Sequence, residues 1–118
     1  MYISPPVLSE VSDENKITHT EVLQVEVLNS LSTNGLASTV MIYLRNRKFD
    51  VVRIGNYPEK DQTKSFIIDR LGDSNSGIYL AKALGIADSL IKIDIDSSLF
   101  LRCSIVIGSD FRNLKPFK

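Results

Sequence analysis

Two kinds of hydrophobic spacing follow one another along this chain, and their order limits the folds that it can form. Segments whose apolar residues alternate or run on continuously favour β-strands, and segments whose apolar residues recur three or four apart favour amphipathic helices. We expect strands at 21–28, 49–54, 64–71, 91–95 and 103–107, a helix at 36–48, and a second, short helix with its N-cap within 72–76 and its inner face at 78–84. This order, β-α-β-β-α-(β)-β, predicts an α/β (α+β) two-layer sandwich with two helices on a mixed sheet of four to five strands, close to a ferredoxin-like fold.

Residues that cap helices and end strands support this order. The polar turn Asn29–Gly35 precedes the first helix, basic residues fill the last turn of that helix at 45–48, and Gly85 closes the second helix. Helix C-termini favour cations, and glycine adopts the left-handed conformation there at least cost. Segment 91–95 alternates strictly and is expected at the sheet edge, whereas the continuous apolar run 103–107 is expected at a more central position.

The length of the chain indicates a single domain flanked by two tails. A chain of 118 residues can bury one modest core. Residues 1–19 contain prolines and polar residues without a hydrophobic period, so we interpret them as a flexible tail or linker. The folded domain is expected at 20–112 and a C-terminal tail at 113–118.

The charge balance and the apolar runs exclude several classes of partner. Fourteen Lys and Arg residues balance fourteen Asp and Glu residues, so no net field attracts a nucleic-acid backbone or an anionic membrane. No apolar run approaches the roughly 18 residues that a membrane span requires. We therefore expect no nucleic acid partner and no membrane contact by this fragment itself. Cys103 is the only cysteine and is expected to be a small buried hydrophobic residue.

The titratable residues do not form a recognisable catalytic or metal-binding pattern. His19 is the only histidine and falls in the expected tail, where a general base would be poorly placed. Asp94, Asp96 and Asp110 could be combined into a carboxylate cluster, but the strand alternation places Asp94 and Asp96 on a solvated face. The chain is therefore predicted not to be an enzyme and to hold no metal or cofactor.

Two places are the best candidates for ligand binding. Asn29, Ser30, Thr33 and Asn34 lie at the entrance of the first helix, where free backbone amides can receive a phosphate or carboxylate. Asp110 follows the last strand. Both places have a structural alternative, in which Asn29 bonds within its own turn and Asp110 ties down a neighbouring loop.

Five pieces of the sequence, in order, resemble the C-terminal domain of LytR-type bacterial cell-envelope proteins over roughly residues 22–111. They are Val25-Glu26-Val27-Leu28-Asn29, Gly35-Leu36-Ala37, Phe49-Asp50-Val51-Val52, Ala81-Lys82-Ala83-Leu84-Gly85 and Val106-Ile107-Gly108-Ser109-Asp110-Phe111. The chain departs from the family pattern at Ser30, where the family usually has a glycine directly after the asparagine. The expected order of elements is also similar to that of SPOR domains, which bind glycan strands on a sheet face.

The resemblance implies an extracytoplasmic accessory domain, on the periplasmic or cell-surface side, anchored through a membrane segment absent from this chain. It also implies that the phosphotransferase activity found in a separate domain of such proteins does not carry over. Our leading hypothesis is a non-catalytic envelope module that binds cell-wall glycan or an envelope partner protein. The alternative is structural self-association, in which segment 91–95 forms a homodimer as an exposed edge strand.

Overall fold

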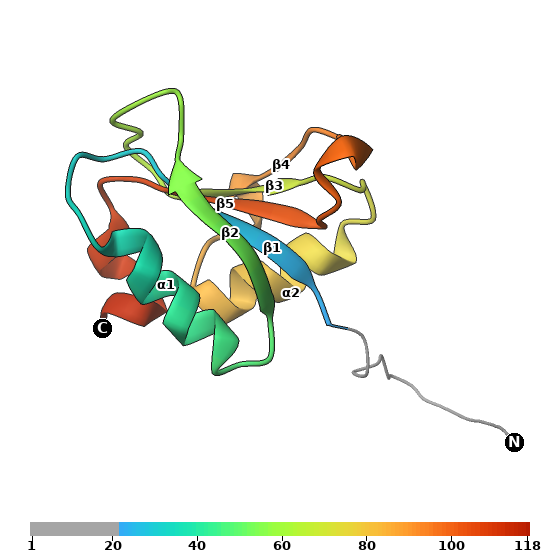
Figure 1. Cartoon of the computed structure of the whole chain (residues 1–118), viewed down its shortest axis with the longest axis horizontal. Coiled ribbons are helices and arrows are strands. Elements are labelled where there is room, and N and C mark those ends of the chain that lie inside the picture. The colour runs from blue at the N-terminus through green and yellow to red at the C-terminus, as the bar shows by residue number, and fades with distance from the viewer. Residues whose placement is uncertain (1–21) are drawn as a thin grey trace, which may run out of the picture.

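The computed structural model describes residues 22–118, which form a sheet layered against two helices (Figure 1). The predicted 1–19 tail and His19 lie outside these residues. The strands and helices are β1 (Gln24–Asn29), α1 (Leu36–Arg45), β2 (Asp50–Asn56), β3 (Phe66–Asp69), α2 (Asn75–Leu84), β4 (Ile91–Ile93) and β5 (Cys103–Ile107). Short 3₁₀ turns are η2 (Asp88–Leu90), η3 (Ser97–Leu99), η4 (Phe111–Asn113) and η5 (Lys115–Phe117).

The sheet is mixed and has five strands in the order β2-β1-β5-β3-β4. Strand β1 is parallel to both β2 and β5, β3 is antiparallel to β5, and β4 is parallel to β3. The predicted sandwich and element order are confirmed, with β4 at an edge and β5 in the centre. The strands joined by each helix are direct neighbours, whereas a split ferredoxin-like unit has another strand between them.

Both helices cover the same face of the sheet, and the main hydrophobic core lies between the two layers (Figure 1). Helix α1 contributes Leu36, Val40 and Leu44, and α2 contributes Leu80 and Leu84. The spacing of three and four residues within each set is the reason that these segments fold as helices on an apolar layer. A smaller cluster of Phe66, Ile68 and Val106 lies apart from this core.

We use the term open face for the sheet surface opposite the helices. Strand register defines it, because directly paired residues point to the same side of a sheet. One row of paired residues crosses all five strands: Arg53, Glu26, Ser104, Ile68 and Lys92. Arg70 and Asp94 extend this surface past the ends of β3 and β4. The open face therefore combines these charged side chains with an apolar strip formed by Phe66, Ile68 and Val106.

The C-terminal segment corrects the prediction of a free tail at 113–118. Leu114 is buried in the main core, and Phe117 packs against it. The rings of Phe111 and Phe117 meet edge to face with centroids 5.1 Å apart. The Lys115 ammonium donates to the carbonyl oxygen of Lys82 at 3.1 Å, which ties the segment to α2. Phe117 and Leu114, together with the ring of Phe111 just before the segment, provide enough apolar surface to dock it on the domain.

The helix boundaries differ from the predictions at one end. Helix α1 ends at Arg45 and not at Lys48, because Lys48 adopts a left-handed conformation with φ of 71° and turns the chain towards β2. Helix α2 begins at Asn75 with Ser74 at its N-cap position, within the 72–76 stretch that was expected to contain the cap. Its predicted end is confirmed, since Gly85 is left-handed and its amide donates to the Ala81 carbonyl at 2.8 Å.

Candidate functional site

The residues predicted to bind a ligand lie at one end of the sheet. Because β1 and β5 are parallel neighbours, their carboxyl ends meet, and Asn29 and Ser30 lie beside the end of β5. Asp110 follows that end of β5 by three residues. Loop 61–65 enters antiparallel β3 at the same end. The fold thus gathers both predicted places around one loop.

Asn29 and Ser30 use their side chains to fix local backbone. The Asn29 carboxamide accepts from the Leu31 amide at 2.9 Å and donates to the Thr33 carbonyl at 2.8 Å. The fully buried Ser30 hydroxyl donates to the Ile107 carbonyl at 2.6 Å and accepts from the Gln62 amide at 3.2 Å. Both side chains therefore hold the turn after β1 and loop 61–65 in place.

Asp110 also binds loop 61–65. Its Oδ1 atom accepts from the Ser65 amide at 2.8 Å and from the Ser65 hydroxyl at 2.7 Å, and that hydroxyl accepts from the Gly108 amide at 2.8 Å. A Cβ atom added at Gly108 would lie 2.6 Å from the carbonyl carbon of Lys64. The Gly-Ser-Asp sequence at 108–110 thus combines a close backbone approach with a carboxylate that bonds the same loop.

Thr33 and Asn34 are exposed and do not cap the first helix. Gly35 occupies the N-cap position in the left-handed region with φ of 87°, and no side chain bonds the helix amides there. The expectation that the turn provides side-chain caps for α1 is therefore wrong. The turn is instead closed by Asn29, the first residue of the predicted turn. Whether Thr33 and Asn34 contact a ligand stays a prediction.

A second polar arrangement, which the sequence did not reveal, lies on the open face. Glu26 lies on the polar face of the first strand, opposite its apolar residues, yet its side chain is only 5% exposed. Its Oε1 atom accepts two bonds from the Arg53 guanidinium, at 2.9 Å from Nε and 2.7 Å from Nη2. A two-bond contact of this kind fixes both side chains and neutralises a buried carboxylate.

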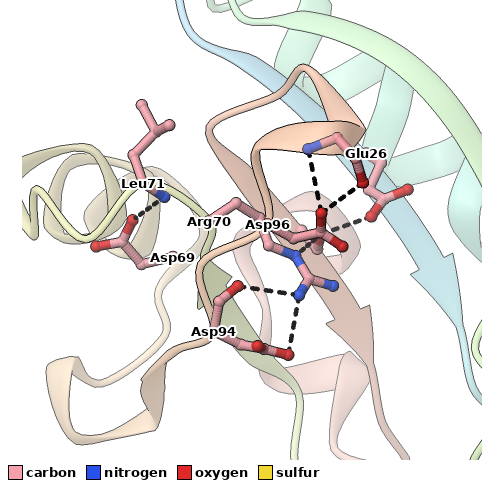
Figure 2. A network of polar contacts seen from close by, with 8 residues as sticks. Glu26, Asp69, Arg70, Leu71, Asp94 and Asp96 are labelled. Atoms are coloured by element: carbon pink, nitrogen blue, oxygen red, sulfur yellow. Dashed lines mark hydrogen bonds and ion pairs between the residues drawn. The ribbon is translucent and has the colours of Figure 1, made fainter.

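The network continues across the central strands to Arg70 (Figure 2). The buried Ser104 hydroxyl donates to Oε2 of Glu26 at 2.5 Å and accepts from Nε of Arg70 at 3.1 Å. Nη1 of Arg70 then donates to the carbonyl oxygen and to Oδ2 of Asp94, both at 3.1 Å. We call the chain Arg53–Glu26–Ser104–Arg70–Asp94 the face network. Its charges alternate in sign from one end to the other.

The two ends of the face network reach solvent while its middle is buried. The Arg53 side chain is 51% exposed and that of Asp94 is 74% exposed, whereas that of Arg70 is only 12% exposed. Polar groups at both ends can therefore bond a ligand without disturbing the buried middle. The sequence interpretation of Asp94 as part of a solvated face is consistent with its exposure, but its bond to Arg70 had no signal in the strand pattern.

Asp96 lies beside the face network and is not a strand residue. It caps η3, where its Oδ1 atom accepts from the Ser98 amide at 3.1 Å and from the Ser98 hydroxyl at 2.5 Å (Figure 2). The hydroxyl bond, helped by the amide bond and the charge of Arg70, lowers the pKa of the Asp96 carboxyl. Phe100, which ends this turn, is 87% exposed and left-handed with φ of 55°.

Aromatic and basic side chains cover the apolar strip of the open face. The ring of Tyr57 meets that of Phe66 nearly perpendicularly, with centroids 5.9 Å apart. The Lys92 ammonium lies 4.2 Å from the centroid of the Phe66 ring. Phe66 itself is buried, as expected for a core residue. Tyr57 and Lys92 cover the strip and are thus the side chains that a ligand would contact there.

The titratable groups of Asp69 and Cys103 are buried in the fold. Asp69 is fully buried, and its carboxylate accepts from the amides of Leu71, Gly72 and Ser74 at 2.8–3.0 Å, which closes the turn before α2. Burial, together with the charge of the neighbouring Asp69, raises the pKa of the Cys103 thiol to about 12. The prediction that Cys103 is buried is confirmed, and its thiol is held in the protonated, unreactive form.

Residues 22–118 contain neither a metal-binding cluster nor a membrane-spanning helix. No group of three or more His, Cys, Asp or Glu side chains in this part of the chain could hold a metal ion. Among the same residues, no helix has the length and apolar character needed to cross a membrane.

Comparison with known proteins assigns a family to most of the chain. The model of the family described as LytR cell envelope-related transcriptional attenuator matches residues 22–111. The matched range runs from just before β1 to the first residue of η4, so it includes the whole sheet and both helices. No curated protein and no solved structure matches the chain.

Proposed function

This chain belongs to the family described as LytR cell envelope-related transcriptional attenuator, and from that premise we propose that it is a non-catalytic accessory domain that binds cell-wall glycan through its open face. The domain is cell-envelope-related by its family. The finer parts of the proposal are an extracytoplasmic location, attachment to the membrane through a segment outside this sequence, and the ligand itself.

The observation that carries this proposal is the face network. Its buried middle holds Arg53 and Asp94 in fixed positions, so their exposed polar atoms need little ordering when a ligand arrives. Sugar hydroxyl and acetamido groups both donate and accept hydrogen bonds, and a guanidinium beside a carboxylate offers both kinds of partner. Tyr57 adds an aromatic ring that packs against Phe66 on the same face.

The charge pattern of the open face favours a neutral ligand over a polyanion. Arg53, Arg70 and Lys92 are balanced by Glu26, Asp94 and Asp96, and positive and negative groups alternate along the surface. A nucleic acid or an anionic polymer would require a surface of one sign. A glycan backbone that offers hydroxyl and amide groups fits the alternation better.

A non-catalytic role is supported by the surroundings of the groups that could act as acids, bases or nucleophiles. The carboxylates of Glu26, Asp69 and Asp110 already bond an arginine or backbone amides within the fold. The Cys103 thiol is buried and protonated. None of these four groups faces a place where a substrate could take their hydrogen bonds without loss of structure.

The proposal is tested by retention of the full chain on purified, protein-free sacculi. We expect wild-type chain to be retained, and Arg53→Gln and Asp94→Asn to lower retention about fivefold or more, because each removes a charged hydrogen-bond partner. Arg47→Gln is the matched control, since Arg47 is an exposed arginine on the helix side that stacks on Tyr43. Far-UV circular dichroism at the temperature of the binding assay checks that each variant is folded, because Arg53→Gln also lowers the melting temperature by removing the cation beside Glu26.

Two outcomes would contradict the glycan proposal. In the first, wild-type chain is retained no better than an unrelated domain of equal net charge. In the second, the chain binds only envelopes that still contain their proteins, and the open-face variants weaken this binding. The second outcome would replace the glycan by an envelope partner protein on the same surface.

A further inference from the structure

The outer edge of β4 carries unpaired backbone groups. Strand β4 pairs only with β3, and the Asp94 amide donates to the Asp69 carbonyl at 3.0 Å, followed by the Asp96 amide to the Arg70 carbonyl at 3.1 Å. Successive residues of a strand direct their backbone groups to opposite sides. The amide and carbonyl groups of Ile93 and Ile95 therefore point away from the sheet.

The side chains along this edge are apolar on one face and charged on the other. Ile93 and Ile95 are each 64% exposed, which is unusual for two isoleucines in one extended segment. Lys92 and Asp94 alternate with them on the open face. Natural edge strands are usually protected from pairing by a short length, a proline, a bulge or charged side chains, especially lysine. Segment 91–95 contains no proline, and its two charges are opposite in sign.

We propose that two copies of this chain associate through β4, with antiparallel pairing centred on Ile93. In this register Ile93 lies opposite Ile93 of the second copy, and Ile91 lies opposite Ile95. Lys92 then faces Asp94 of the second copy, and Asp94 faces Lys92. The segment is complementary to itself in charge and apolar character at every position.

The backbone directions are compatible with this register. An antiparallel pair that exchanges two hydrogen bonds requires both residues to direct their groups outward, as Ile93 does. The Ile95 amides can then donate to the Ile91 carbonyls of the other copy. The Ile91 amide is excluded, because it already donates to the Asp88 carbonyl. A centre at Lys92 or Asp94 would oppose like charges at the central pair, so the charges exclude these two registers.

This pairing joins the two sheets into one and leaves both open faces on the same side. The reason is that directly opposed residues of antiparallel strands point to the same face. A dimer would therefore present two face networks side by side. Tighter glycan binding by two such surfaces rests on the proposed function. Formation of the dimer does not rest on it.

The proposal is tested by sedimentation equilibrium of the full chain between about 10 and 500 μM, a range that captures dissociation constants of weak specific dimers. We expect a monomer–dimer equilibrium for wild type. Ile93→Pro removes an outward amide and no ladder bond, so it should keep the fold and its melting temperature while the dimer is lost. A monomeric wild type throughout this range would overturn the proposal.

A pair of charge variants tests the register. Lys92→Asp alone places carboxylates opposite each other, and Asp94→Lys alone places ammonium groups opposite each other, so each should dimerise at least about tenfold more weakly than wild type. An equal mixture of the two variants restores opposite charges at both contacts and should form a heterodimer. Variants that dimerise as wild type does, or a mixture that associates no better than its components, would overturn the register.

Discussion

Gly108→Ala should destabilise the domain strongly, because the backbone of loop 61–65 lies where the new methyl group would be. The added Cβ would be 2.6 Å from the Lys64 carbonyl carbon, 2.7 Å from its oxygen and 2.8 Å from the Gln62 carbonyl oxygen. All three are backbone atoms, so no side-chain rotation relieves the overlap. The loop must move by several tenths of an ångström or more.

The cost has two parts. Forcing a methyl group into a packed contact costs about 1–3 kcal/mol. Movement of the loop also weakens the bonds from the Gly108 amide to the Ser65 hydroxyl and from the Ser109 amide to the Gln62 carbonyl, both 2.8 Å. Each is worth about 0.5–1.5 kcal/mol. We expect the free energy of unfolding to fall by about 3 kcal/mol.

Urea unfolding followed by circular dichroism measures this change, and Gly55→Ala is its control. A Cβ at Gly55 would meet only the Leu28 side chain, at 3.8 Å, and Gly55 does not have a positive φ. That variant should stay within about 0.5 kcal/mol of wild type or gain slightly, because alanine restricts the unfolded chain. Equal stability of the two variants would refute the close approach at Gly108.

Three further substitutions or reactions probe the same structure. Asp110→Ala should lower the free energy of unfolding by about 1–3 kcal/mol, because the Ser65 amide loses its acceptor. An unchanged melting temperature would contradict this. Loss of sacculus binding with an unchanged melting temperature would make Asp110 a ligand contact. Arg53→Met should lower the free energy of unfolding by about 1–2 kcal/mol, because buried Glu26 loses the cation that neutralises it. The loss is modest because half of the Arg53 side chain is in solvent. Arg47→Met is the control, and equal stability of the two variants would argue against the face network. Cys103 should resist iodoacetamide at pH 8.5 until urea unfolds the chain. Its thiol has a pKa of about 12 when folded against an ordinary 9.0, so its contribution to stability is complete below pH 9 and is lost as the pH rises towards 12. Rapid native labelling, or the same alkaline loss of stability in Cys103→Ala, would contradict this.

Hydrophobic spacing was sufficient to predict the layers of this fold. The period-two and period-3.6 segments became the strands and helices of the sandwich, and strict alternation at 91–95 correctly placed β4 at an edge. The C-terminal segment was misjudged because Leu114 and Phe117 are too few to produce a period, although both pack on the core. The left-handed turn at Lys48 also had no local signal, since glycine and asparagine usually occupy such positions.

The candidate site was predicted less well, for a physical reason. Asn29 and Asp110 were identified because turn residues that bond nearby backbone are recognisable from their position in sequence. The face network joins residues far apart in the chain, such as Glu26 with Ser104 and Arg70 with Asp94. Its partners depend on strand order and register, which periodicity leaves open. Glu26 therefore read as an ordinary solvent-facing strand residue.

The most direct test of glycan recognition by the open face is a residue-by-residue map of binding. Amide chemical shifts of the isotopically labelled full chain would be followed while soluble, protein-free glycan strands released from sacculi are added. Glycan binding through the open face predicts that the largest shifts cluster at Glu26, Arg53, Arg70 and Asp94. Shifts confined to the outer surfaces of α1 and α2, or no shifts at saturating glycan, would contradict it.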